Sequence, residues 1–298
     1  MKRKMAFILI IILVFTGVGV FFIFTSSDTE VQQTFKSVPS EQEATDDNNK
    51  TGEPKQEQEK RKESENDDAK THVKTFVEDA VQSTIDYFTN KEAHIVAIGD
   101  SLTQGVGDSS GEGGYVGILD NTINKRTHLA EFENYGKRGN RSDQLLKRLD
   151  NPQIVQSIKE SDIVIITIGA NDIMKVLKEN FTSLSYNDFA KERDDYKNRL
   201  TKIFDKINEL NPKTKIYLIG FYNPFEKYFP EIKELGIIVK DWNTIGKNVT
   251  SGYENAAFIP TIDLLADTNV DLYAEDNFHP NTLGYQRIAK RVLEYLTE

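Results

Sequence analysis

The stretch Ile95–Gly105 reads IVAIGDSLTQG. Its apolar first half ends at Gly99, and Asp100 and Ser101 follow in a polar turn that can open a helix. This order is typical of a buried parallel strand that runs into a sharp turn. Because ligands bind at the carboxyl ends of strands in open α/β sheets, Ser101 is a candidate functional residue. The alternative is that Ser101 only caps the helix, as serine often does at such turns.

The composition of the chain excludes several classes of function. Its 298 residues have room for one or two domains, and 38% hydrophobic with 28% charged residues suit a soluble domain with a polar segment attached. Cysteine is absent, which excludes disulfides, thiolate metal sites and cysteine nucleophiles. The net charge of -10 argues against a nucleic-acid partner, because binding phosphates requires basic patches.

Residues 1–25 predict a transmembrane anchor. Basic residues at positions 2–4 precede an uncharged run over residues 6–24, and about 19 such residues can cross the hydrocarbon core as a helix. Acidic residues follow the run, so the positive-inside rule predicts a single-pass cell-membrane protein with an extracytoplasmic C-terminal domain. The alternative is a cleaved signal peptide and a secreted domain, since the small residues 25–27 leave a cleavage site open. The length of the apolar run favours the anchor.

Two further segments follow the anchor. Residues 26–70 are rich in charged and amide side chains and almost free of large apolar ones, which predicts a disordered acidic linker. A folded domain is expected over residues 71–298, and it begins with a helix because apolar residues recur at helical spacing between Val73 and Phe88. We expect this accessory helix to pack on the domain. Binding to a membrane surface is the alternative, although the polar face lacks basic residues.

From His94 onward, strand-like and helix-like segments alternate. The predicted strands are His94–Ile98, Glu131–Tyr135, Asp162–Ile168, Lys215–Ile219 and Ala256–Thr261. The clearest helices are Tyr186–Leu210 and Thr282–Leu296. The third and fourth strands are almost continuously apolar, as expected for strands covered on both faces. The alternation therefore predicts a parallel sheet with helices on both sides.

Three other segments carry glycine or polar residues after a predicted strand or near the chain end. NYGKRGNRSDQLL contains Gly136 and Gly139, GAND spans Gly169–Asp172, and DNFHP spans Asp276–Pro280. The loops that follow parallel strands gather at one edge of the sheet. We therefore expect these segments to meet near the serine although they are far apart in sequence.

A serine nucleophile needs a base, and the candidate is His279. It lies just before the last predicted helix and three residues after Asp276. In this arrangement the carboxylate accepts from one ring nitrogen while the other nitrogen faces Ser101. The other histidines lie before the first predicted strand, at the start of that strand and in a polar stretch: His72, His94 and His128. The alternative is a surface Asp/His pair beside a helix cap.

Acyl transfer also needs donors for an oxyanion. The candidates are the backbone N–H groups of Ser101 and Gly139 and the side-chain amide of Asn171. A glycine suits a backbone donor that approaches the substrate closely, because it has no side chain. The alternatives are a turn glycine and a turn or cap asparagine. Their joint occurrence at successive strand ends favours the oxyanion role.

These segments resemble the four sequence blocks of the GDSL or SGNH hydrolase superfamily. GDSL at Gly99–Leu102, Gly139, GAND and DNFHP occur in the family's order and at similar spacing, from about His94 to the chain end. In detail the chain is similar to membrane-anchored GDSL-type lipase/esterase-like proteins of Gram-positive bacteria. The resemblance implies a three-layer α/β/α, flavodoxin-like fold with a five-stranded parallel sheet and no metal or organic cofactor. The G-x-S-x-G elbow of α/β-hydrolases is absent around Ser101, which argues against that other fold.

The resemblance also implies roles for single residues. The nucleophile, the oxyanion glycine and asparagine, the acid and the base fall on Ser101, Gly139, Asn171, Asp276 and His279. The second block is the loosest match, because the run RGNRS replaces the more usual small residues after the glycine. Gly136 therefore remains an alternative to Gly139.

The sequence thus predicts a serine hydrolase that cleaves carboxylic esters at the extracytoplasmic membrane face. Its partners are a small-molecule, lipid or acylated-glycan ester and the membrane, and we expect a monomer. One alternative is an O-acetyl deacetylase acting on cell-wall or exported polysaccharide, and another is a non-catalytic surface binding module. Aromatic residues after the fourth strand either line an acyl pocket or simply pack: Tyr222, Phe225, Tyr228 and Phe229.

Overall fold

The computed structural model describes residues 92–180, 185–225, 233–266 and 269–297. The predicted anchor, linker and accessory helix lie outside these residues, as do Tyr228 and Phe229. Within the described ranges, no helix is long and apolar enough to cross a membrane.

One five-stranded sheet forms the centre of the domain. Its strands are β1 (Ala93–Gly99), β2 (Ala130–Gly136), β3 (Ile163–Thr167), β4 (Lys215–Ile219) and β5 (Ala256–Ile259). All neighbouring strands are parallel, in the order β2-β1-β3-β4-β5. The predicted five-stranded parallel sheet is therefore confirmed, with strand ends within two residues of those expected.

The strands form here because their side chains are apolar on both faces. Every residue of β3 is buried, and β1 is buried at six of its seven positions. The edge strand β2 mixes charged and apolar residues and is only partly covered. This pattern is typical of a parallel sheet whose interior strands are covered by helices on both sides.

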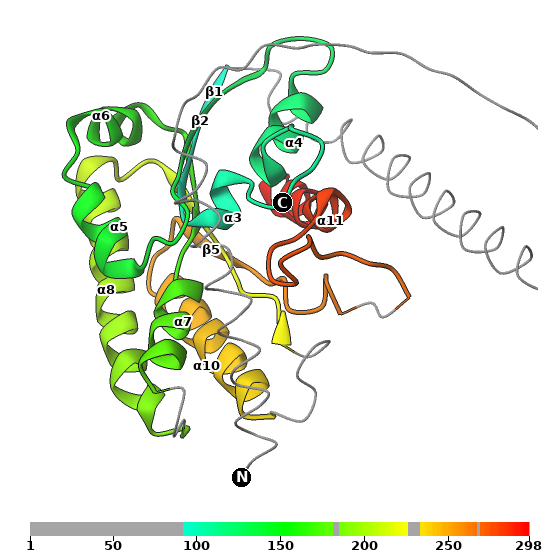
Figure 1. The fold of residues 1–298 in the computed structure, drawn as a ribbon. Coiled ribbons are helices and arrows are strands. Elements are labelled where there is room, and N and C mark those ends of the chain that lie inside the picture. The colour runs from blue at the N-terminus through cyan, green and yellow to red at the C-terminus, as the bar shows by residue number, and fades with distance from the viewer. Residues whose placement is uncertain (1–91, 181–184, 226–232, 267–268, 298) are drawn as a thin grey trace, which may run out of the picture. The chain divides into compact units, whose positions relative to one another are not determined.

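Helices cover both faces of the sheet (Figure 1). They are α3 (Ser101–Gln104), α4 (Gly114–Ile123), α5 (Ser142–Arg148), α6 (Pro152–Glu160), α7 (Ala170–Glu179), α8 (Asp188–Leu210), α10 (Lys233–Thr250) and α11 (Thr282–Leu296). Helices α4 and α11 pack together on one face, while α8 contacts α5, α6, α7 and α10 on the other. The result is the three-layer α/β/α arrangement that the resemblance implied.

The strand order reverses between β1 and β3. The chain leaves β1 toward β2 on one side and later passes from β3 to β4 on the other. At such a switch point the loops that follow the two strands diverge and leave a crevice at the carboxyl edge of the sheet. Gly99 at the end of β1 is paired with Gly136 of β2 and Thr167 of β3, so all three loops start at the same level.

Candidate active site

The turn after β1 frees the Ser101 hydroxyl from helix capping. The N-cap of α3 is Asp100, whose side chain accepts a hydrogen bond from the Leu102 N–H at 3.0 Å. Ser101 is therefore the first helical residue, and its amide has no intrahelical acceptor. A Cβ on Gly99 would lie 2.2 Å from the Thr167 carbonyl oxygen, so this turn can approach β3 only with glycine.

The segment that carries Asp276 and His279 is closed by its own hydrogen bonds. The Ala274 N–H donates to the His279 carbonyl at 2.8 Å, and Tyr273 and Pro280 form an isolated antiparallel bridge. Asp276 Oδ1 accepts from the backbone N–H groups of Phe278 (3.0 Å) and His279 (2.9 Å). The Asp276 carboxylate is therefore held in place by backbone N–H groups of its own segment.

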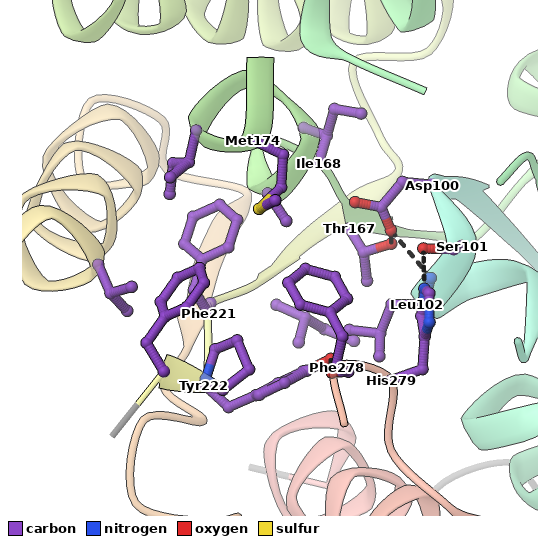
Figure 2. A pocket seen from close by; sticks show the side chains of 17 residues that line it. Asp100, Ser101, Leu102, Thr167, Ile168, Met174, Phe221, Tyr222, Phe278 and His279 are labelled. Atoms are coloured by element: carbon purple, nitrogen blue, oxygen red, sulfur yellow. Dashed lines mark hydrogen bonds between the residues drawn. The ribbon is translucent and has the colours of Figure 1, made fainter. Parts of the chain in front are cut away.

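Ser101, His279 and Asp276 form one hydrogen-bonded chain. His279 Nε2 lies 2.8 Å from Ser101 Oγ (Figure 2), and His279 Nδ1 lies 2.5 Å from Asp276 Oδ2. Burial raises the pKa of Asp276, but the hydrogen bond and the charge of His279 outweigh burial and lower this pKa to about 2. The ionised carboxylate orients the ring, and the ring can accept the serine proton as a general base does.

Gly107 lets the loop after α3 approach His279 and Pro280 closely. Gly107 has a φ of +98°, and a Cβ there would lie 2.9 Å from the His279 Cβ and 2.5 Å from the Pro280 carbonyl oxygen. The adjacent Val106 carbonyl accepts from the Tyr285 hydroxyl at 2.7 Å, which ties this loop to α11. The loop after α3 therefore packs closely against the backbone that carries His279.

The other histidines of the described region lie away from this site. His94 is at the start of β1, with its Nε2 3.7 Å from Glu133 Oε2, and His128 Nε2 lies 2.9 Å from Glu92 Oε1. Both lie toward the amino ends of the strands, at the edge of the sheet opposite Ser101.

The two glycines after β2 have different surroundings. A Cβ on Gly136 would lie 2.2 Å from the Gln104 backbone nitrogen, so Gly136 lets β2 pack directly against α3. Gly139 is exposed, has a φ of +77° and would place a Cβ in open space. The left-handed turn at this position favours glycine, and a glycine also allows a close backbone approach. The Gly139 amide lies in the accessible part of the loop.

Asn171 is joined to the Gly139 loop through a residue that the sequence analysis missed. The Asn171 Nδ2 donates to the Asn140 carbonyl at 3.0 Å, while Asn140 itself is 4% exposed. An amide nitrogen carries two hydrogens, so Asn171 keeps one for another acceptor. The structure therefore brings Gly139 and Asn171 together, and no hydrogen bond joins either residue to Ser101 within the described region.

Asp172 of GAND is a second residue that the sequence analysis left without a role. It is fully buried and accepts from the Ser142 N–H (3.0 Å), the Ser142 hydroxyl (2.6 Å) and the Arg199 guanidinium (3.0 Å). Glu192 also pairs with Arg199. Asp172 thus fastens the start of α7 to the start of α5, immediately below the Asn140–Asn171 contact.

A pocket with mainly apolar walls opens beside Ser101 (Figure 2). Tyr222 and Phe225 line it, as one of the two sequence alternatives expected, together with Phe221, Phe278 and Met174. In Figure 2, Phe221 and Met174 lie across the pocket from Ser101 and His279. The Tyr222 hydroxyl donates to the Phe278 carbonyl at 2.9 Å, which joins this wall to the Asp276–His279 segment.

Comparisons with known proteins agree with this fold and show the family of the chain. The model of the GDSL-like Lipase/Acylhydrolase family matches residues 97–287. The Bacillus subtilis (strain 168) "Uncharacterized protein YpmR" is 39% identical over 69% of this chain and 83% of its own length. The "Spore germination lipase LipC" of Bacillus licheniformis is 27% identical over 66% of this chain and 92% of its own length. The crystal structure of the lipase Lip_vut3, from a goat rumen metagenome, superimposes with a TM-score of 0.60 over 67% of this chain and 95% of that one, at 22% identity, which is a likeness of fold.

Substitution of Gly136 and Gly139 should show which glycine is needed for close packing and which for its backbone conformation. Gly136→Ala forces backbone atoms apart and should lower the melting temperature strongly. The Cβ of Gly139→Ala has free space around it. This variant should therefore lose only about 1–2 kcal/mol of unfolding free energy, because alanine is strained at a positive φ. Thermal unfolding of both variants measures the difference, and an equal or larger loss in Gly139→Ala would contradict the assignment of Gly136 to packing.

Asp100 should make stability depend on pH. Burial raises the pKa of Asp100 to about 6, although hydrogen bonds from Leu102 and Thr167 oppose this shift. The folded state therefore binds the Asp100 proton more tightly than the unfolded state, and this contribution to the unfolding free energy is lost as the pH rises from about 4 to about 6. Asn keeps the acceptor oxygen but cannot ionise, so Asp100→Asn should gain stability relative to the wild type over this range.

Denaturant unfolding of the wild type and Asp100→Asn at about pH 4.5 and about pH 7.5 checks this prediction. Asp263→Asn is the control, because a hydrogen bond from Arg291 lowers the pKa of Asp263 and keeps it ionised across the interval. A stability difference between Asp100→Asn and wild type that is the same at both pH values would show that Asp100 does not titrate as assigned.

Proposed function

This chain belongs to the GDSL-like lipase/acylhydrolase family of carboxylic ester hydrolases, and we propose that Ser101, His279 and Asp276 are its catalytic triad. The observation that carries the proposal is the continuous hydrogen-bonded chain from Asp276 through His279 to Ser101. Ser101 and His279 are 6% and 7% exposed, so their hydrogen bond lies in a largely water-excluded crevice. Electrostatic interactions are stronger in such surroundings than in bulk water.

In the proposed reaction, His279 Nε2 takes the proton from Ser101 Oγ as that oxygen attacks the acyl carbon. The tetrahedral oxyanion receives hydrogen bonds from the N–H groups of Ser101 and Gly139 and from the second hydrogen of the Asn171 amide. When the intermediate collapses, His279 returns the proton to the leaving alcohol. A water molecule then repeats the sequence on the acyl-enzyme and releases the carboxylic acid.

The pocket supports an ester with an acyl chain of several carbons. Its walls are mainly aromatic and aliphatic, and each buried methylene stabilises a bound chain by about 0.8 kcal/mol. An acetyl group would leave most of these walls unfilled, so the pocket supports a lipase-like esterase over the O-acetyl deacetylase alternative. Phe221 is firmly placed for such a role, because the Asn243 side chain binds both its N–H (2.7 Å) and its carbonyl (2.9 Å).

The proposed place of action is the extracytoplasmic face of the cell membrane. Support comes from the uncharged run at residues 6–24, its basic N-terminal flank and the polar segment that follows. A lipid or other membrane-associated ester would then be close to the tethered domain.

Loss of the nucleophile should abolish hydrolysis without unfolding the domain. Ser101→Ala and His279→Ala should each lower kcat for p-nitrophenyl esters by about 10⁴-fold or more, because each removes a member of a unit that acts together. His128→Ala is the matched control, since that histidine pairs with Glu92 away from the site. Unchanged thermal unfolding together with wild-type hydrolysis by Ser101→Ala would refute the triad.

The acyl chain-length profile should depend on Phe221. Phe221→Ala removes a pocket wall and should move the best p-nitrophenyl ester to longer chains, with about a fourfold gain in kcat/KM for each additional buried methylene. Phe132→Ala is the control, because that half-buried aromatic residue lies on β2 and packs against the buried core outside the pocket lining. An unchanged profile in Phe221→Ala, measured from acetyl to palmitoyl, would show that this pocket does not bind the acyl chain.

A further inference from the structure

Arg148, the last residue of α5, reaches three oxygen atoms at the carboxyl edge of the sheet. Its guanidinium donates to the Tyr135 carbonyl at 2.6 Å, to Asn140 Oδ1 at 2.9 Å and to the Gly99 carbonyl at 3.3 Å. These acceptors belong to the end of β1, the end of β2 and the loop after β2. One side chain therefore joins three backbone segments that are distant in sequence.

The acceptors of Arg148 are all uncharged. Within the described residues, no carboxylate forms an ion pair with this guanidinium, whereas Arg141, Arg193, Arg199 and Arg291 each have at least one such partner. Arg148 is half-buried, and this burial lowers the pKa of its guanidinium. Placing a cation in a partly dry site without a counter-charge costs free energy, so the three hydrogen bonds must hold it there.

Two of these contacts, to Gly99 and Asn140, lead to the three proposed oxyanion donors. The Gly99 carbonyl belongs to the peptide that enters Asp100, one residue before the Ser101 amide, and it also accepts from the Lys137 N–H at 3.0 Å. Asn140 follows Gly139 directly, and its carbonyl accepts from Asn171 Nδ2 at 3.0 Å. The planar guanidinium has five donors in a fixed geometry, which suits it to set the relative positions of several acceptors.

We propose that Arg148 is a positioning residue that holds the turn after β1 and the loop after β2 in the geometry needed to bind the oxyanion. The inference rests on the proposed function of Ser101, Gly139 and Asn171. Arg148 acts through Gly99 and Asn140 and does not contact the reacting atoms. Its positive charge, left without a carboxylate partner among the described residues, also favours negative charge developing at the donors.

The kinetic test compares Arg148→Ala with Arg291→Ala on a p-nitrophenyl ester that the wild type hydrolyses. Arg291 is the matched control, because it also binds a backbone carbonyl, that of Pro260, but lies between α11 and the loop after β5. Arg148→Ala should lower kcat by about 10- to 100-fold, because small displacements of reacting groups have effects of that size, and should leave KM within about twofold. Guanidinium or ethylguanidinium at millimolar concentration should restore part of the loss in Arg148→Ala and none in Arg291→Ala.

Arg148→Lys is the second variant, and it serves as the test if Arg148→Ala does not fold. Lysine keeps the positive charge at this position. Lysine cannot span three acceptors with a planar group, so Arg148→Lys should also lose kcat selectively. Wild-type kcat in both variants, a loss equal to that in Arg291→Ala, or a change in KM alone would overturn the inference.

Hydrogen exchange provides a readout that does not depend on catalysis. The backbone amides of residues 136–141 should exchange at least about tenfold faster in Arg148→Ala than in the wild type, and added guanidinium should slow them again. Unchanged exchange would overturn the inference even if the enzyme is active. Faster exchange in a protein whose wild type hydrolyses no ester would instead support the positioning role while refuting the proposed function.

Discussion

The alignment of three strand ends is the constraint on which the site depends. Gly99, Gly136 and Thr167 stand at the same level of the sheet, and the first two must be glycine because a Cβ would meet backbone atoms at 2.2 Å. This close approach brings the turn after β1, the loop after β2 and the start of α7 to one edge. Without it, Ser101 and Asn171 would still be present but would not share a crevice.

The close approach buries polar groups, and the structure satisfies them in two linked clusters. Beneath the Ser101 turn, the Thr167 hydroxyl donates to Asp100 at 2.9 Å, and Thr103 contacts both Thr167 (2.7 Å) and Tyr115 (3.0 Å). Beneath the Asn171 turn, Ser142 and Arg199 saturate Asp172. Buried polar groups left unpaired would destabilise the fold, so each cluster also fixes the loop above it.

Sequence patterns predicted the sheet well because its interior strands β1, β3 and β4 are short, mainly apolar runs bounded by glycine, proline or polar turns. Both ends of α8 and the start of α11 were also predicted closely, since proline or asparagine marks them. The roles of Gly136 and Gly139 were not separable, because both precede polar residues and only the packing of α3 distinguishes them. Asn140 and Arg148 were missed for another reason. Their contacts run from side chains to backbone carbonyls of other elements, such as Arg148 to Gly99 across 49 positions, and no short motif records such a bond.

Phe278 belongs both to the wall of the pocket and to the segment that carries Asp276 and His279. Its ring belongs to the pocket wall, its N–H binds the Asp276 carboxylate at 3.0 Å, and its carbonyl accepts from Tyr222. Substitutions of Phe278 can therefore alter the substrate range only by changing the size and shape of the side chain, while the backbone turn stays intact. Evolution can widen or narrow the pocket more freely from Phe221 and Met174, which lie on separate elements and can change without disturbing the acid and the base.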